Sequence, residues 1–393
     1  MDALILLPAY LYRLAVLGIS LYVALHKVKK IPHCRSARRN SYVFVFPVYN
    51  EQIIIRETIS YYEQFLAHYA NISLLFVATD KETQRPTTAE IIGHYCQGSK
   101  YAERMKIIHS HNLKGTKATQ LNVALDYIRA QSHGSLPILV CFDCDARIAL
   151  EDWPKALAYI QNHEKALLFS FLPKPQSSRS FLVQSLMLHH QERMLVFEYA
   201  AALSDTIFWH YPMGATMLVK PQLWQKIDQF PEPIDDIPLR YQLYLNGLHY
   251  SSLPFFTLVQ APPNMTNAFQ QIIPIFKGVF SYFALAKKSQ LRLTLAHICY
   301  GLGWYGIYLA EFYSILILPI ALARNSWSLP VIFLIQVIIN LVLAQQLSLL
   351  NAFKHILGYG LRLAQFLFFL IKVLLFPINL EKYKTERVNS ISK

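Results

Sequence analysis

Two aspartates, Asp143 and Asp145, close an apolar run in the segment LVCFDCDARI at residues 139–148. If the run continues as a β-strand through both residues, the two carboxylates point the same way, because side chains two apart share one face of a sheet. A pair of carboxylates on one face is a candidate ligand-binding or catalytic site. What it binds depends on the rest of the chain.

Cys141 and Cys144 form a C-x-x-C in the same segment, so a redox or zinc site is the alternative chemistry. Residues three apart on a strand face opposite sides, and neither a disulfide nor a shared metal suits this pair without a sharp bend. The five cysteines of the chain are scattered and odd in number, which indicates a reducing compartment. The carboxylate pair is the better candidate.

The composition indicates a membrane protein, because 54% of the 393 residues are hydrophobic and only 16% are charged. The formal net charge is +13, and basic residues cluster beside apolar segments, in HKVKK, RSARR and AKKSQLR. This pattern is typical of the cytoplasmic face of a membrane, whose lipids are the expected partners. No basic helix or patch stands apart from these segments, so we do not expect nucleic acid as a partner.

Residues 1–27 predict an N-terminal transmembrane anchor. Residues 3–25 are long enough to cross a hydrocarbon core and are interrupted by one charge, Arg13. A cleaved signal peptide is the alternative, but the segment lacks a charged start and a small-residue cleavage site. We therefore expect a retained anchor whose basic, C-terminal side is cytoplasmic.

Residues 293–380 predict C-terminal transmembrane or interfacial helices, followed by a basic tail at 381–393. Lys372 interrupts the last apolar segment, which therefore either spans the membrane or lies in its interface. An interfacial segment would keep the basic tail on the cytoplasmic side, as the positive-inside tendency favours. The apolar segments lie near 296–321, 329–348 and 361–380.

Residues 41–270 alternate short apolar runs with amphipathic stretches. The alternation predicts an α/β domain with a mostly parallel sheet covered by helices on both faces. Ligands bind at the carboxyl ends of such strands, where Asp143 and Asp145 lie. The expected strands are SYVFVFPVY, ISLLFVAT, MKIIHS, LPILVCFD and KALLFSFL, and the expected helices are IIIRETISYYEQFLAHY and KATQLNVALDYIRAQ.

Five motifs follow one another in this region. They are PVYNE, FVATD, HNLKGTKATQLN, FDCDA and IDDIPL. Their order and spacing over about residues 41–250 resemble those of the membrane-bound members of glycosyltransferase family 2. The resemblance implies the GT-A fold, a Rossmann-like α/β sheet with flanking helices, in a cytoplasmic domain attached to transmembrane helices. D-x-D alone is common by chance, whereas five motifs in order are specific.

The resemblance implies that Asp145 and Asp143 hold Mg²⁺ or Mn²⁺ at the diphosphate of a nucleotide-sugar donor, for which hard oxygen ligands are suited. We expect a UDP-sugar. Glu51 could instead cap the following helix, and Lys117 could be a solvated loop lysine. The positions that match donor-binding residues of the family are Pro47, Tyr49, Glu51, Asp80, Lys117 and Asp143.

The resemblance implies that Asp236, in the IDDIPL motif, is the catalytic base, which takes the proton of the acceptor hydroxyl. Asp235 stands where the family usually has glutamate, and two adjacent carboxylates would raise one pKa. The alternative is that this motif simply begins a helix, with Pro238 in its first turn. The expected acceptor contacts are Gly214, His210 and Phe276.

Processive members of the family carry Q-x-x-R-W after the base motif, but residues 269–283 contain no Arg-Trp. We therefore expect an inverting hexosyl- or N-acetylhexosaminyl-transferase that extends a lipid-linked or glycan acceptor by one or a few sugars, with its catalytic domain on the cytoplasmic side of a bacterial inner membrane. Residues 271–292 predict an amphipathic interfacial segment that holds the acceptor tail or anchors the domain. The alternatives are a processive polysaccharide synthase and a nonenzymatic membrane protein with a degenerate GT-A domain.

Overall fold

The chain divides into two compact units. The sheet unit comprises the described residues of 40–174 and 214–260, and the helical unit those of 2–25, 175–200 and 261–375. The computed structural model describes residues 2–25, 40–132, 136–176, 178–200, 214–232, 234–279, 281–288, 293–343 and 348–375.

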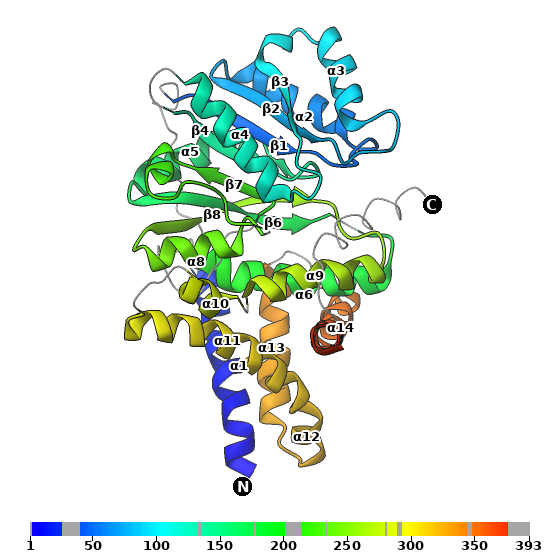
Figure 1. Cartoon of the computed structure of the whole chain (residues 1–393). Helices are drawn as coiled ribbons and strands as arrows, with labels where there is room; N and C mark the ends of the chain where they lie inside the picture. The colour runs from blue at the N-terminus through cyan, green and yellow to red at the C-terminus, as the bar shows by residue number, and fades with distance from the viewer. Residues whose placement is uncertain are drawn as a thin grey trace. The chain divides into compact units, whose positions relative to one another are not determined.

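Eight strands of the described chain form one mixed sheet in the order β3-β2-β1-β4-β7-β6-β8-β5 (Figure 1). β1 pairs in parallel with β2 and β4, and β2 pairs in parallel with β3. β7 pairs antiparallel with β4 and β6, and β5 with β8. The predicted α/β sheet is confirmed, with its parallel order confined to β3-β2-β1-β4. The strands are β1 (Tyr42–Pro47), β2 (Ile72–Thr79), β3 (Met105–Ser110), β4 (Ile138–Phe142), β5 (Arg147–Ile148), β6 (Ala166–Pro175), β7 (Thr216–Val219) and β8 (His249–Val259).

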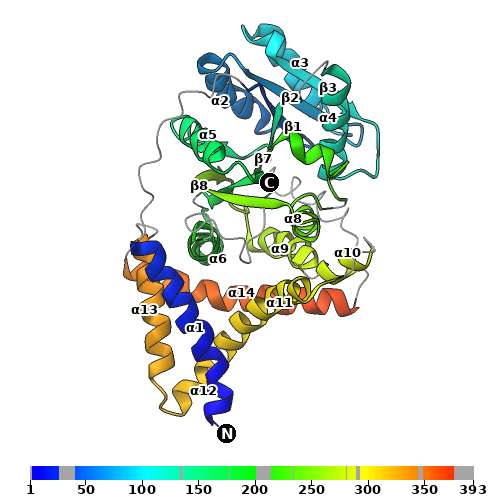
Figure 2. The same ribbon diagram turned by 90° about the vertical axis from the view of Figure 1, so that its left-hand side faces the viewer.

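Helices cover both faces of the parallel half of the sheet, and α2 and α4 lie on opposite faces (Figure 2). Phe44 and Phe46 of β1 pack in the core that contains α2, whereas Val45 packs in the core that contains α4. Successive strand residues alternate between the faces, so a strand buried on both sides must be apolar throughout. The helices of the sheet unit are α2 (Ile55–His68), α3 (Thr88–Gly98), α4 (Lys117–Gln131), α5 (Trp153–Asn162) and α8 (Ile237–Leu245), with 3-10 turns η2 (Ala102–Arg104) and η4 (Pro221–Gln225).

The two cysteines of the C-x-x-C lie in different cores. Cys141 packs with the α4 face and Cys144 with the α2 face. Burial raises the pKa of the Cys141 thiol to about 12 and that of Cys144 well above its ordinary value. Thiols that do not ionise near neutral pH are poor nucleophiles and ligands, so both cysteines act as core residues.

The helical unit contains two helices that are long and apolar enough to cross a membrane, Ile5–Leu25 and Leu295–Ala323, and a shorter apolar helix, α13. α14 runs crosswise to α1 and α13 (Figure 2) and exposes large apolar residues such as Leu349, Phe353 and Ile371. Whether this last apolar segment spans the membrane or lies in its interface stays a prediction. The elements are α1 (Asp2–Leu25), α6 (Phe181–Arg193), the π-helical η3 (Met194–Tyr199), α9 (Met265–Val279), α10 (Tyr282–Lys288), α11 (Leu295–Leu316), α12 (Leu318–Ala323), α13 (Ser328–Leu343) and α14 (Leu349–Leu375).

Arg13, the charge that interrupts the predicted anchor, is buried between helices. Its side chain donates a hydrogen bond to Gln336 Oε1 at 3.2 Å, and its guanidinium lies 4.6 Å from the ring centroid of Phe333 and 5.0 Å from that of Tyr359. Long amphipathic side chains are retained inside helix bundles when neighbouring polar and aromatic groups solvate them. α1 is thus attached to α13 and α14 by a polar contact as well as by apolar packing.

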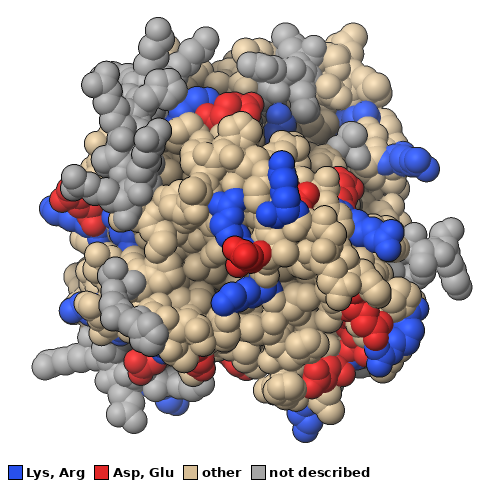
Figure 3. All heavy atoms as spheres, turned by 90° about the horizontal axis from the view of Figure 1, so that it is seen from above, with Lys and Arg blue, Asp and Glu red and all other residues tan. Residues whose placement is uncertain are grey.

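The charges of the molecule do not separate by sign on the face drawn in Figure 3. Lys and Arg side chains there are interspersed with Asp and Glu. On this face the net positive charge forms no single basic patch.

Gly358 allows α14 to approach α6 closely. A Cβ at this position would lie 2.2 Å from the carbonyl oxygen of Ser185 and 3.0 Å from His189 Cβ. Gly360, in the same helix, has nothing within 4 Å of the equivalent position. The two glycines therefore form a matched pair for testing this contact.

We expect Gly358→Ala to destabilise the protein by about 1–3 kcal/mol, because overpacking forces the two helices apart. Gly360→Ala should be neutral or stabilising by up to about 1 kcal/mol, since alanine favours the helix. Thermal unfolding of both detergent-purified variants measures the difference. Equal stability of the two variants would contradict the close contact of α6 with α14.

Candidate active site

The D-x-D aspartates lie on a turn after β4. β4 ends at Phe142, and the Asp143 N–H donates to Ala215 O at 2.8 Å. The expectation that Asp143 and Asp145 share one face of a continuing strand is therefore wrong. The chain turns as soon as β4 ends, and the two carboxylates have different partners.

Lys117, the first residue of α4, brings three motifs together. Its Nζ lies 2.7 Å from Asp143 Oδ1 and 3.1 Å from Asp235 Oδ2, and it donates to Gly214 O at 2.6 Å. Burial would lower the pKa of Lys117, but the two carboxylates outweigh burial and raise it. The ammonium group stays charged inside the site, so the alternative of a solvated loop lysine is wrong.

Asp236 occupies the N-cap of α8 and faces the same cluster. Its Oδ1 accepts a hydrogen bond from Ile237 N at 2.7 Å, and its Oδ2 accepts one from Gly214 N at 3.1 Å. Burial and the neighbouring charge of Asp235 raise the pKa of Asp236 to about 6, against the opposing effect of Lys117. The alternative that the IDDIPL motif begins a helix is therefore correct. The raised pKa of Asp236 is a further property, which an ordinary N-cap aspartate does not have.

The three expected acceptor residues differ in their placement. A Cβ at Gly214 would lie 2.7 Å from Asp236 Oδ2, so a larger residue here would require this carboxylate to shift. His210 lies outside the described residues. Phe276 is fully buried in the helical unit, where its ring packs 5.1 Å from that of Phe369. A ring without an exposed face cannot stack on a sugar, so we withdraw the expected acceptor role of Phe276.

Asp145 and Asp143 are the residues that would hold the predicted divalent cation. Asp145 is mostly buried, and its Oδ2 accepts a hydrogen bond from Gln260 N at 2.9 Å. Among the described residues no group of three or more His, Cys, Asp or Glu side chains could hold a metal ion. Mg²⁺ typically takes one or two carboxylates and completes its coordination with substrate phosphates and water. The pair therefore fits a cation that binds together with a diphosphate.

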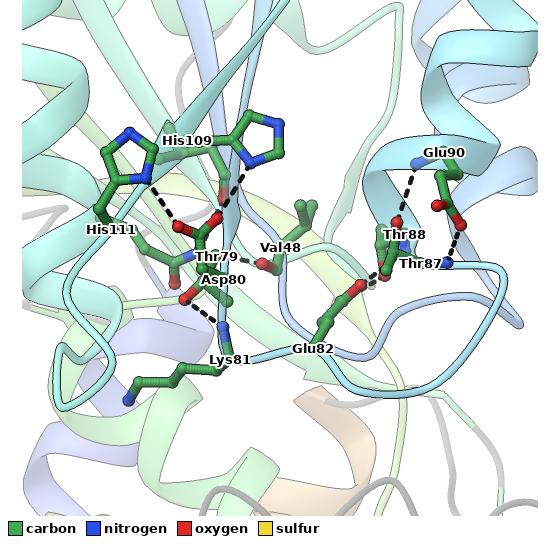
Figure 4. A network of polar contacts seen from close by, with 12 residues as sticks. Val48, Thr79, Asp80, Lys81, Glu82, Thr87, Thr88, Glu90, His109 and His111 are labelled. Atoms are coloured by element: carbon green, nitrogen blue, oxygen red, sulfur yellow. Dashed lines mark hydrogen bonds and ion pairs between the residues drawn. The ribbon is translucent and has the colours of Figure 1, made fainter.

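Asp80 follows β2 and lies beside two histidines at the end of β3 (Figure 4). Asp80 Oδ2 is 2.7 Å from His111 Nδ1, and Oδ1 is 3.4 Å from His109 Nδ1. The hydrogen bond with His111 is the main cause of the lowered pKa of Asp80. This exposed carboxylate can accept hydrogen bonds from the N–H groups of a nucleobase. We did not foresee the histidines, although their spacing of two residues at a strand end is a signal for one shared face.

Gln120 is a further residue that sequence reasoning missed. From α4, one turn after Lys117, its Nε2 donates to Val48 O at 2.9 Å and to Val77 O at 2.7 Å. It thereby joins the end of β1, where the predicted donor residue Pro47 pairs with Val77, to the end of β2. A buried glutamine on a helix face that is otherwise apolar was the available signal.

Tyr49 and Glu51 lie on the partly exposed loop between β1 and α2. The Glu51 N–H donates to Thr88 Oγ1 at 3.0 Å. Ile54, not Glu51, occupies the N-cap position of α2. This loop follows Pro47, the last residue of β1. Asp80 and Asp143 follow β2 and β4, and Lys117 begins the helix after β3, so these residues all come after the carboxyl ends of the parallel strands.

Comparisons with known proteins found similarity to one family model and to solved structures. Residues 43–223 match the model of the family described as Glycosyl transferase family 2. Mannosyltransferase PcManGT from Pyrobaculum calidifontis, solved in complex with GDP-Man and Mn²⁺, is similar in structure, with a TM-score of 0.56 at 17% identity over 94% of this chain and 99% of that chain. TarS 1–349 from S. aureus, in complex with UDP-GlcNAc, has a TM-score of 0.38 at 16% identity over 83% of this chain and 91% of that one. The sequence matches no curated protein.

The likeness to PcManGT concerns the fold, because the identity is low. The family match covers β2, α4, β4 and β7, the elements that flank or carry Asp80, Lys117, Asp143 and Gly214. The mixed sheet with its flanking helices is like that of GT-A glycosyltransferases, and residues 43–223 of it match the model of glycosyl transferase family 2.

Proposed function

We propose that the protein is an inverting glycosyltransferase that moves a sugar from a nucleotide-sugar donor to a lipid-linked or glycan acceptor. The observation that carries the proposal is the cluster of Lys117 with Asp143, Asp235 and Asp236. The family 2 domain and the apolar helices of the helical unit support it. The proposed location is the cytoplasmic face of a bacterial inner membrane, where nucleotide sugars are available.

The donor would bind along the carboxyl ends of the parallel strands. Asp143 and Asp145 would hold Mg²⁺ or Mn²⁺, which when bound stabilises negative charge on the leaving diphosphate. Lys117 neutralises Asp143, and Asp80 with Tyr49 would contact the base. PcManGT was solved with GDP-Man and Mn²⁺, so GDP-sugars join the expected UDP-sugars as candidate donors.

The acceptor hydroxyl would attack the anomeric carbon from the side of Asp236. The new bond joins the hydroxyl oxygen to that carbon as the bond from carbon to the diphosphate oxygen breaks. The leaving nucleoside diphosphate keeps the electron pair, and Asp236 takes the hydroxyl proton. One displacement inverts the anomeric configuration. A base with a pKa of about 6 is mostly deprotonated at pH 7 and is stronger than an ordinary aspartate.

Short products are favoured over a polymer. Of the three aromatic residues that could replace the missing Arg-Trp platform, Phe276 and Tyr282 are fully buried, and Phe280 lies outside the described residues. The Tyr282 hydroxyl donates to His297 O at 3.1 Å, within the helical unit. Neither ring has an exposed face for a translocating sugar chain.

The proposal is tested by incubating the purified protein in membranes with radiolabelled UDP-, GDP- and dTDP-sugars and separating lipid extract from aqueous polymer. We expect labelled glycolipid from one donor class, abolished by excess chelator and by Asp145→Ala. Asp152→Ala, which removes a carboxylate remote from the cluster, should retain activity. Long water-soluble chains would instead support a polysaccharide synthase, and no transfer from any donor would refute glycosyl transfer.

The pH dependence of kcat/KM should report Asp236. Because its pKa is raised to about 6 and the base must be deprotonated, kcat/KM should fall about tenfold per pH unit below 6 and level off above it. Asp236→Asn should reduce turnover by about a hundredfold or more with donor binding nearly intact.

Lys117→Met should shift the acidic fall of kcat/KM to higher pH, since the substitution removes the positive charge that holds the pKa of Asp236 down. Lys114→Met, an exposed lysine in the preceding loop, is the matched control. An unshifted fall in Lys117→Met, in protein that still unfolds cooperatively, would assign the titration to another group.

Gly214→Ala should reduce kcat by about tenfold or more, because the added methyl group displaces the Asp236 carboxylate. Gly93→Ala, with nothing within 4 Å of the added Cβ, should leave kcat unchanged. Steady-state kinetics of the two variants decide the question. Full activity of Gly214→Ala would mean that the carboxylate position is not critical.

A further inference from the structure

Three successive residues after β2 connect to three different parts of the site. Asp80 contacts the histidines after and within β3, Lys81 Nζ donates to Gly115 O in the loop before α4, and Glu82 reaches the loop between β1 and α2. The proposed function uses Asp80. It assigns no role to Glu82, whose contact with Thr88 Figure 4 shows.

The Glu82 carboxylate accepts three hydrogen bonds. The Asn50 N–H donates to Oε1, the Thr88 hydroxyl donates to Oε1 at 2.6 Å, and the Thr88 N–H donates to Oε2 at 2.6 Å. Thr88 is fully buried, and its Oγ1 in turn accepts from the Glu51 N–H. The amides of two successive loop residues, Asn50 and Glu51, are therefore held by Glu82, one directly and one through Thr88.

The loop held in this way has an unusual backbone conformation. Asn50 has a φ of 54°, in the left-handed region, which non-glycine residues adopt uncommonly. Asparagine tolerates this region better than most residues, but the conformation still needs support from its surroundings. The hydrogen bond from Asn50 N to Glu82 provides such support.

We propose that Glu82 is a positioning residue for donor binding. Its carboxylate fixes Asn50 in the left-handed conformation and so orients the flanking residues Tyr49 and Glu51 toward the donor. The inference rests on the proposed function, because it takes Tyr49 and Glu51 as donor contacts. The inference gives a role to Glu82, which lies outside the recognised motifs. It also explains why this residue is charged, since only a carboxylate can accept hydrogen bonds from all three donors at once.

The simpler reading is that Glu82 only stabilises the first turn of α3, where an acidic group is favourable. Glu90 provides a direct comparison. It forms a capping box with Thr87 at the same helix end, accepting from Thr87 N at 2.7 Å, and none of its hydrogen bonds reaches the β1–α2 loop. A substitution at Glu90 therefore weakens the helix start without releasing Asn50.

The test compares Glu82→Gln with Glu90→Gln in the full-length protein in detergent. Titration calorimetry with UDP and with GDP, each with Mn²⁺, measures binding, and steady-state kinetics separate KM from kcat. We expect Glu82→Gln to weaken binding and raise the donor KM by about tenfold, about 1.4 kcal/mol, with kcat nearly unchanged at saturating donor. Glu90→Gln should change neither parameter by more than about twofold, whatever its effect on the unfolding temperature.

Glycine at position 50 provides the rescue. Asn50→Gly adopts positive φ without steric penalty, so the double variant of Glu82→Gln with Asn50→Gly should recover most of the lost affinity. Hydrogen exchange of the amides in residues 48–52 without nucleotide should be faster in Glu82→Gln than in Glu90→Gln.

Two results would overturn the proposal: equal effects of Glu82→Gln and Glu90→Gln on binding, or unchanged exchange in the loop. Absence of rescue by Asn50→Gly would refute the role of the Asn50 conformation. If the wild-type protein binds neither nucleotide, both the proposed function and the positioning role fail. If the wild-type protein binds normally and Glu82→Gln binds equally well, only the positioning role fails.

Discussion

One buried ammonium group, that of Lys117, makes the arrangement of acidic residues in this site physically tolerable. Asp143 and Asp235 both contact it, and Asp236 lies close enough for its pKa to be held down by the same charge. Carboxylates buried together without a cation would repel one another and take up protons. Losing one member of a buried charge cluster leaves the others uncompensated, which is strongly unfavourable. The position of α4, which carries Lys117, therefore affects how far the pKa of Asp236 is raised.

The position of α4 is itself determined by polar contacts with strand ends. Gln120 bridges the ends of β1 and β2, and Lys81 donates to the loop before the helix. Apolar packing against the sheet leaves a helix some freedom to slide, whereas hydrogen bonds to two carbonyl groups specify its register. The same residues that close the core on this side thus align the lysine with its carboxylates. The hydrogen bonds of Gln120 and Lys81 therefore both stabilise the fold and position the site.

Local sequence pattern predicted the parallel half of the sheet well. The runs ISLLFVAT and MKIIHS coincide with β2 and β3, and KATQLNVALDYIRAQ coincides with α4. These segments are apolar on the faces they bury and are bounded by polar turns. β7 and β8 were not predicted, because β7 has four residues and β8 contains Ser251, Ser252 and Pro254. Their place in the sheet depends on antiparallel pairing between segments far apart in the chain.

The sequence predicted the site residues that belong to a motif. It did not predict the residues whose role depends on a contact with a distant part of the chain. Asp143, Asp236 and Lys117 came from motif order, and the structure brings them together. β4 ends at Phe142, and the turn that follows is closed by a hydrogen bond from Ala146 N to Asp143 O, which no local pattern reveals. Glu82 and Gln120 have roles that arise from carbonyl and amide groups of other loops. Phe276 was misassigned because an aromatic residue in an amphipathic helix looks the same whether it faces a ligand or the interior.

The burial of Arg13 has a consequence for how the protein is made. Its polar partner, Gln336, is more than 300 residues later in the chain. In the proposed membrane location, the first helix would emerge from the ribosome and enter the bilayer long before α13 is synthesised. An arginine near the middle of an apolar helix is unfavourable in lipid by about 2.5–3.5 kcal/mol on insertion scales. Arg13 would therefore gain these polar and aromatic neighbours only after α13 and α14 are translated, when the residues of the sheet unit have already been synthesised.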